Sequence, residues 1–192
     1  MIAPPDPPLS GSGVTLRPPS GDDLAALVRI CSDPDVQRYT LAPGDEPGVR
    51  VWIERREDGW RDGSGGSFVI SDASGEVVGW IGAWFLADGI AQIGYAVGPD
   101  ARGRGIATQA LRLVVAWLFR ETSCERLQLL TNIGNGASER VAAKAGFRAE
   151  GVLRSYLSQR GERQDVTMHG LLRSDLRGPR ALTGTTRDRR AE

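Results

Sequence analysis

Lysine and histidine are nearly absent from this chain of 192 residues: Lys144 is the only lysine and His169 the only histidine. Cysteine is also scarce, with Cys31 and Cys124 alone. No His/Cys cluster has the spacing of metal ligands, so we expect no bound metal. Two cysteines give no disulfide framework, and we expect two buried free thiols.

The chain has neither excess charge nor a long apolar run. It carries 24 Lys and Arg and 24 Asp and Glu, so its formal net charge is zero and nothing in the total attracts nucleic acid. No run reaches the roughly 18 apolar residues of a membrane span. Residues 1–8 lack the basic start and apolar core of a signal peptide. We therefore expect a cytoplasmic protein that binds neither nucleic acid nor membrane.

The most informative stretch is a glycine-rich turn, Arg102–Thr108. The apolar run Ile93–Val97 leads into it as a predicted strand, and an amphipathic pattern over Ile106–Phe119 leaves it as a predicted helix. Glycines let the backbone approach an anion, and the N–H groups and dipole of a first helical turn attract it. Arg102 and Arg104 add charged donors. The turn therefore predicts a phosphate-binding loop.

Three known loops have this architecture. The P-loop requires Gly-Lys-Ser/Thr, and the only lysine lies elsewhere. The dinucleotide fingerprint requires a third glycine where this chain has Thr108. The third pattern, Arg/Gln-x-x-Gly-x-Gly/Ala, is matched fully by residues 102–107 and resembles the coenzyme A pyrophosphate loop of the GNAT N-acetyltransferase superfamily. For the turn taken alone, a solvent-exposed Gly/Arg loop is the alternative.

A second set of motifs follows about thirty residues later in the order expected for that superfamily. It consists of Asn135-x-x-Ser138, Lys144-x-Gly146-Phe147, Glu150-Gly151-x-x-Arg154 and Gly161-x-x-x-Asp165. This run resembles the C-terminal half of the GNAT fold and, more narrowly, the branch of ribosomal-protein alanine and serine N-acetyltransferases. Together the two signatures cover roughly residues 12–176.

The order of elements predicts a mixed α/β sheet, because a meander of antiparallel strands precedes the glycine-rich turn. The resemblance implies a GNAT-like fold of about seven mostly antiparallel strands and about four helices, splayed into a V between the fourth and fifth strands. Those two strands are Ile90–Val97 and Leu127–Thr131. We assign residues 13–176 to the acetyltransferase domain, 1–12 to a disordered or loosely docked arm and 177–192 to a disordered tail.

The resemblance also implies acetyl-CoA as the cofactor. Its pantetheine arm would lie in the V and pair with the backbone of one strand, as an added strand does. Its pyrophosphate would bind the N–H groups of the glycine-rich turn. The cofactor-binding residues so predicted are Tyr95, Ala96, Val97, Arg102, Gly103, Arg104, Gly105, Ile106, Ala107, Thr108, Asn135 and Ser138.

Acetyl transfer needs a donor to the oxyanion and an acid for the leaving thiolate. The resemblance places the oxyanion donor at a backbone N–H near Val97. Many members of the superfamily use a tyrosine seven residues after the asparagine as the acid, and this chain has Ala142 there. The N-terminal-acetyltransferase branch has a serine three residues after it, so Ser138 is the candidate acid. A helix-capping role is the equal alternative.

The general base stays open. Gln92 stands where related sequences often carry glutamate, and an amide cannot accept the proton. A water chain, Asp165 or Glu150 would then serve, although Asp165 is equally a structural partner for Arg154. Tyr95 is a candidate site wall, with core packing as its alternative. The predicted catalytic residues are Ser138, Asp165 and Tyr95.

The activity that the resemblance implies is N-acetylation of a primary amine, either a protein N-terminus or a small molecule such as an aminoglycoside, a polyamine or an amino acid analogue. A polycationic acceptor would require an acidic pocket. The carboxylates available for such a pocket are Asp45, Glu46, Glu54, Glu57 and Asp58. The alternative is that they form a solvated helix face. The competing hypothesis is a catalytically weak coenzyme A-binding sensor or interaction module. A homodimer is expected only by analogy with the N-terminal-acetyltransferase branch.

Overall fold

The computed structural model describes residues 3–86 and 89–177, and within them eight strands form one sheet in the order β1-β2-β3-β4-β5-β6-β8-β7. Every neighbouring pair is antiparallel except β5 and β6, which are parallel. The predicted mixed α/β class is confirmed. The strands are β1 Leu9–Gly11, β2 Val14–Arg17, β3 Gly65–Ser71, β4 Val77–Phe85, β5 Ile90–Val97, β6 Arg126–Asn132, β7 Arg148–Gln159 and β8 Glu162–Leu172.

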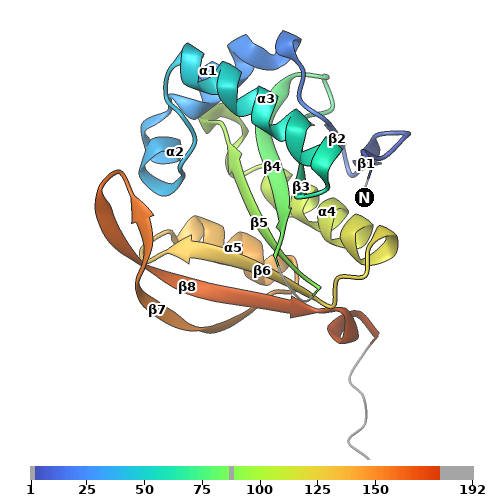
Figure 1. Ribbon diagram of the computed structural model, residues 1–192, viewed down its shortest axis with the longest axis vertical. Coiled ribbons are helices and arrows are strands. Elements are labelled where there is room, and N and C mark those ends of the chain that lie inside the picture. Colours follow the sequence, from blue (N-terminus) through green and yellow to red (C-terminus); the bar gives the residue numbers. More distant parts are fainter. Residues whose placement is uncertain (1–2, 87–88, 178–192) are drawn as a thin grey trace, which may run out of the picture.

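Helices cover both faces of the sheet (Figure 1). On α4, Leu111, Val114 and Leu118 recur at intervals of three and four residues and are fully buried against one face. Leu27 of α1 and Trp52 of α3 pack with Trp80 of β4 in a second cluster on the other face. The helices are α1 Leu24–Cys31, α2 Pro34–Tyr39, α3 Glu46–Asp62, α4 Ile106–Glu121 and α5 Gly136–Lys144. Because both faces are covered, β3 is buried along its whole length.

The sheet splits where β5 and β6 separate. These strands pair only from Ile90 with Arg126 to Ile93 with Leu129. Beyond that point β5 continues to Val97 beside β4, while β6 continues to Asn132 beside β8. Figure 1 shows the two halves diverging, with α2 and the β7–β8 hairpin on either side of the opening. The predicted V between these two strands is confirmed.

One detail of the fold differs from expectation, at the N-terminus. Within residues 1–12, predicted as a disordered or loosely docked arm, Leu9–Gly11 forms β1 and pairs with β2 from Leu9↔Leu16 to Gly11↔Val14. Leu9 packs against the main core, which gives this short strand an apolar anchor. The predicted tail over 177–192 lies outside the described residues from position 178 onward.

Other expectations can be checked directly. Cys31 and Cys124 are buried free thiols, as predicted. Burial raises the pKa of the Cys31 thiol to about 11, so the thiolate is disfavoured at neutral pH. No helix in the described part of the chain combines the length and the apolar character needed to cross a membrane.

The contact between α3 and β3 requires a residue without a side chain at position 66, which is Gly66. Trp60 donates its indole N–H to the Ser67 carbonyl at 3.2 Å and packs edge-on against Phe68 at 5.2 Å, so its ring is fixed. A Cβ at Gly66 would overlap that ring. We expect Gly66→Ala to lower the free energy of unfolding by about 1–3 kcal/mol, measured by chemical denaturation.

Gly21→Ala is the matched control, because a Cβ there meets no atom within 4 Å. If both variants unfold at the same denaturant concentration, the steric account of Gly66 is wrong.

Candidate active site

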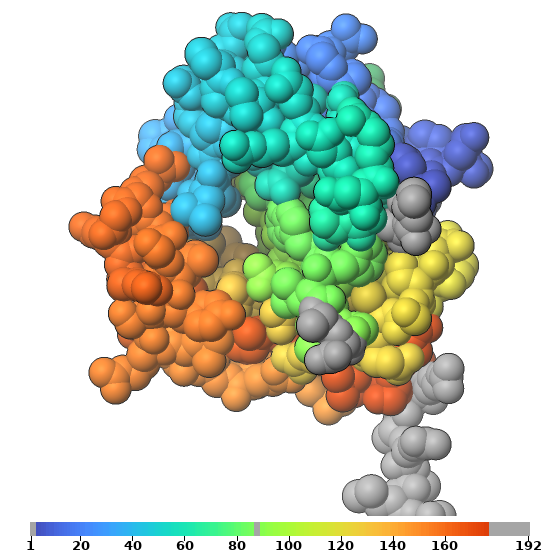
Figure 2. All heavy atoms as spheres, viewed as in Figure 1, coloured from blue at the N-terminus to red at the C-terminus, as the bar shows by residue number. Residues whose placement is uncertain are grey.

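A single continuous cleft of about 1380 Å³ runs through the split in the sheet. Figure 2 shows the surface hollowed between β5, the α2 region and the β7–β8 hairpin. On one side the cleft is lined by the glycine-rich turn and the start of α5, and on the other by the α2–α3 segment. All the residues predicted to bind the cofactor line it except Arg104.

The free edge of β5 faces the cleft. The Gly98 N–H donates to the Val78 carbonyl at 2.9 Å, and the Leu86 N–H donates to the Ile90 carbonyl at 2.8 Å. Even-numbered residues of β5 therefore direct their backbone groups to β4, because pairing in an antiparallel ladder alternates. The backbone N–H and C=O groups of Tyr95 and Val97 point the other way, into the opening where β6 has departed. The Val97 carbonyl accepts the Arg102 Nε–H at 3.4 Å, and the remaining groups form an edge onto which an extended amide-bearing ligand can pair.

The glycine-rich turn has the geometry of an anion cradle. Gly103 and Gly105 have φ angles of 76° and 79°, a left-handed conformation that favours glycine, and the space beside each is open. Gly105 is the N-cap of α4, and the first helical bond runs from the Gln109 N–H to its carbonyl at 3.1 Å. The backbone N–H groups from Gly103 to Thr108 have no hydrogen-bond partner in the described chain. They are available to a pyrophosphate, with the helix dipole behind them.

The two arginines of this turn do not extend toward the cradle. Arg102 forms ion pairs with Asp33 and, at 2.8 Å, with Asp35. Arg104 pairs with Asp72 at 3.0 Å and does not line the cleft. Carboxylates thus compensate both guanidinium groups, and the prediction that they supply charge to the anion stays a prediction. Their visible role is to fasten the turn to the start of α2 and to the β3–β4 turn.

Four cations that sequence reasoning did not assign to the site line the cleft, and two of them lie on α5. Arg140 and Lys144 stand four residues apart on α5 and share one face of it. Lys144 is predicted from the sequence as a solvated charge at a helix C-terminus. The available sequence signal was the spacing of four residues between Arg140 and Lys144, which follow the Asn135 motif. This spacing becomes informative only once α5 is placed opposite the glycine-rich turn.

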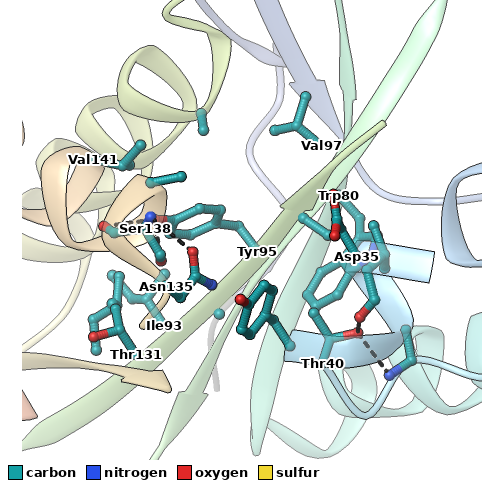
Figure 3. Close-up of a pocket in the computed structure, with 18 of the residues that line it drawn as sticks. Asp35, Thr40, Trp80, Ile93, Tyr95, Val97, Thr131, Asn135, Ser138 and Val141 are labelled. Carbon is teal, nitrogen blue, oxygen red and sulfur yellow. Dashed lines mark hydrogen bonds between the residues drawn. The ribbon is translucent and has the colours of Figure 1, made fainter. Parts of the chain in front are cut away.

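Tyr95 and Ser138 meet across the cleft, although they are 43 positions apart. Asn135 caps α5 by accepting the Ser138 N–H on Oδ1 at 3.1 Å, which fixes the serine at the first turn. The Tyr95 hydroxyl lies 2.8 Å from Ser138 Oγ and 3.3 Å from the Ser138 carbonyl (Figure 3). Burial raises the pKa of Tyr95 to about 12, so the phenol stays protonated at neutral pH.

The predicted bases lie elsewhere. Asp165 is outside the cleft lining, and its Oδ1 accepts the backbone N–H of Ser155 at 2.7 Å, where β7 bulges. This contact, rather than an ion pair with Arg154, is its structural role. Glu150 is held by Arg126 at 2.5 Å, which keeps the pKa of this carboxyl below its usual value. Neither side chain is placed to take a proton from a group in the cleft.

Other polar residues near the split have structural partners. His169 is buried, and its Nε2 lies 2.9 Å from Thr131 Oγ1; burial lowers its pKa. Gln92 lines the cleft and accepts the amide N–H of Gln128 at 3.2 Å. Asp35 is the only carboxylate among the described residues that line the cleft, and it forms an ion pair with Arg102. The cleft therefore has no unpaired side-chain base in the described chain.

The tip of the β7–β8 hairpin closes one end of the cleft. The buried Gln159 donates to the carbonyls of Arg38 and Thr40 at 2.9 and 3.0 Å, and it accepts from the Asn132 amide at 3.0 Å. This side chain ties β7 and β6 to the segment that follows α2. Nothing in the local sequence signalled it, because Asn132 lies 27 residues away and its two backbone partners more than a hundred.

The acidic residues considered for a polycationic acceptor do not line the cleft. On α3, Glu46 pairs with Arg50 at 2.8 Å and Asp58 pairs with Arg61 at 2.7 Å, all on the exposed face of the helix. The solvated-face reading of these carboxylates is the one that the structure supports.

Comparison with known proteins agrees with this geometry. The family model described as "Acetyltransferase (GNAT) domain" matches residues 14–148. The chain is 29% identical to the uncharacterized N-acetyltransferase p20 of Bacillus licheniformis over 170 residues, which is 86% of this chain and 96% of that protein.

Solved structures show the same fold. Mycobacterium smegmatis RimJ in complex with CoA-disulfide is 27% identical with a TM-score of 0.77, covering 85% of this chain and 83% of that one. RimL, a ribosomal L7/L12 α-N-protein acetyltransferase in complex with coenzyme A, gives a TM-score of 0.76 at 21% identity, covering 86% and 96%.

The cleft, the anion cradle at the start of α4 and the free β5 edge define an acyltransferase that binds a coenzyme A thioester. The chain belongs to the GNAT acetyltransferase family, and its cofactor is acetyl-CoA.

The open left-handed glycine at the start of α4 gives a direct test of the cradle. We expect Gly105→Glu to abolish coenzyme A binding in calorimetry, because it adds a carboxylate beside the unpaired N–H groups and strains a φ of 79°. Gly105→Asn is the control, since asparagine tolerates this conformation and carries no charge. It should retain most of the affinity. If both variants bind as wild type does, the pyrophosphate lies elsewhere.

Proposed function

We propose that this enzyme transfers the acetyl group of acetyl-CoA to a primary amine. The observation that carries the proposal is the continuity of the cleft across the sheet. The cradle and the start of α5 open onto the β5 edge from one side, and the α2–α3 segment opens onto it from the other. A thioester held on that edge would be open to an amine arriving from the opposite side.

The residues at the edge can perform the steps of acyl transfer. Acetyl-CoA supplies an activated thioester carbonyl, which a neutral amine attacks. The Val97 N–H, directed into the cleft, is positioned to stabilise the developing oxyanion. Ser138 donates a proton toward the departing sulfur, and the Tyr95 hydroxyl donates to Ser138 Oγ in turn, which leaves the serine proton free. Tyr95 and Ser138 are the catalytic residues of this proposal.

The amine must also lose a proton. Gln92 cannot accept it, and the carboxylates of Asp165 and Glu150 are engaged outside the cleft lining. Of the three routes that the sequence left open, a water chain from the cleft to bulk solvent agrees best with this arrangement. Asp165 is accordingly not retained as a base in the proposal.

The acceptor is either a protein N-terminus or a small-molecule amine. The likeness to RimJ and RimL supports the first, because RimL is described as acting on the α-amine of a ribosomal protein. The same scaffold accommodates either, and fold alone does not choose between them.

The assay that tests the function is release of free thiol from acetyl-CoA over a panel of amines. Peptides beginning with Ala, Ser or Met and small primary amines form the two arms, with Gly105→Glu as the inactive reference. Thiol release with any primary amine supports the proposal, and the arm that responds names the acceptor class. Coenzyme A binding without turnover on any amine would replace the proposal with a sensor or interaction module.

The pairing of Tyr95 with Ser138 predicts a specific kinetic effect. We expect Ser138→Ala to lower kcat by about 10²-fold, as loss of a general acid does, and Tyr95→Phe to lower it less. Neither change should alter the coenzyme A dissociation constant more than a few-fold, which calorimetry would check. An unchanged kcat in Ser138→Ala would assign this serine to helix capping alone.

A further inference from the structure

A single arginine packs against two tryptophan rings at the wall of the cleft. The Arg56 guanidinium of α3 lies 4.9 Å from the ring centre of Trp52, also on α3, and 4.8 Å from that of Trp84 on β4. All three residues line the cleft. Two aromatic rings therefore stabilise this cation at the cleft wall by cation–π contacts.

Among the described residues, this cation has no counter-ion. Arg56 takes part in no ion pair and no hydrogen bond among the described residues, and its Nε is buried without a partner. Burial lowers the pKa of Arg56 to about 10, so the group is still charged at neutral pH. Other arginines that meet the sheet, such as Arg17 and Arg126, each have a carboxylate. A desolvated and unpaired guanidinium is costly unless a ligand completes it.

The surroundings offer nothing else to neutralise it. Arg55 lines the same side, and the only carboxylate in the described cleft lining, Asp35, is bound to Arg102. Both rings pack against the guanidinium, and its N–H donors make no hydrogen bond among the described residues, so they are available to an incoming group. A planar carboxylate matches these donors in a bidentate pair.

The place of Arg56 relates it to the acceptor rather than to the cofactor. Trp84 pairs with Gln92 of β5, and Ala96 of the same strand packs in the cluster beneath α1 and α3. The glycine-rich turn belongs to α4, on the opposite face of the sheet. Arg56 therefore stands across the sheet from the anion cradle.

We propose that Arg56 binds a carboxylate of the amine acceptor. The inference rests on the proposed function and narrows its substrate class to amines that carry a carboxylate near the reacting nitrogen. Such a carboxylate comes from either of two sources: the α-carboxylate of a free amino acid, or an acidic side chain close to the N-terminus of a peptide. A polyamine or an aminoglycoside has no group for this site.

Matched acceptor pairs test the proposal. The first pair is alanine and alaninamide, and the second is a C-terminally amidated peptide beginning Ala-Glu and its Ala-Gln counterpart. Wild type should favour the carboxylate member of at least one pair by about tenfold or more in kcat/KM, the size expected for a hydrogen-bonded charge. The pair that shows the preference identifies the source of the carboxylate.

Substitutions assign the preference to the residue. Arg56→Gln should bring the ratio close to one, mainly through a higher KM, whereas Arg56→Lys should keep part of it because the charge remains. Arg50→Gln is the matched control on the same helix; Arg50 is exposed, pairs with Glu46 and does not line the cleft. Thermal unfolding and coenzyme A binding of each variant show whether it is folded.

The outcomes separate this inference from the function on which it rests. Turnover without a carboxylate preference, or a preference that Arg56→Gln leaves intact, overturns the role of Arg56 while the acetyltransferase function stands. If no amine is acetylated, the function fails, and calorimetry on the coenzyme A complex still decides the site. There, in wild type but not in Arg56→Gln, N-acetylalanine should bind more tightly than N-acetylalaninamide, or an amidated N-acetyl-Ala-Glu peptide more tightly than its Ala-Gln counterpart. Equal binding within both pairs in wild type would overturn the inference.

Discussion

The structure depends on the point at which β5 and β6 stop pairing. Buried backbone N–H and C=O groups must be hydrogen-bonded, so a strand that loses its neighbour inside a protein needs another partner. From Tyr95 to Val97, β5 keeps β4 on one side and has the open cleft on the other. The unpaired edge is enclosed by helices and by the β7–β8 hairpin. It is therefore a strand-addition site that is shielded from aggregation and matched to an amide-containing ligand.

Charge is arranged around this edge in an unexpected way. The arginines of the glycine-rich turn are compensated by carboxylates of neighbouring segments, so they hold the turn in place. The N–H groups at the start of α4 are unpaired in the described chain, and Arg140 and Lys144 of α5 line the same cleft. Backbone donors have fixed directions, so the cradle is preorganised and its shape is set by two left-handed glycines.

The sequence predicted what short local motifs encode. The structural roles of Gly103, Gly105 and Asn135 involve only residues close to them in the sequence. These residues lie where the motifs imply. Contacts between distant segments were not predictable in this way. Asp165 has the expected motif position, but a bulge at Ser155 engages its carboxylate. The strand β1 was missed because three residues, two of them Ser and Gly, have little strand propensity, and register with β2 stabilises them.

The two sides of the cleft use different kinds of recognition. In the proposed function, main-chain groups of β5 and α4 bind the cofactor, so the fold itself specifies that ligand. On the other side of the sheet, side chains of α3 and β4 line the cleft, among them Arg56 packed against two tryptophans. Those side chains can change without altering the sheet or the cradle. The choice of acceptor is thus separable from the binding of the cofactor. For this reason the fold indicates the reaction, whereas the substrate must be inferred from the side chains that line the cleft.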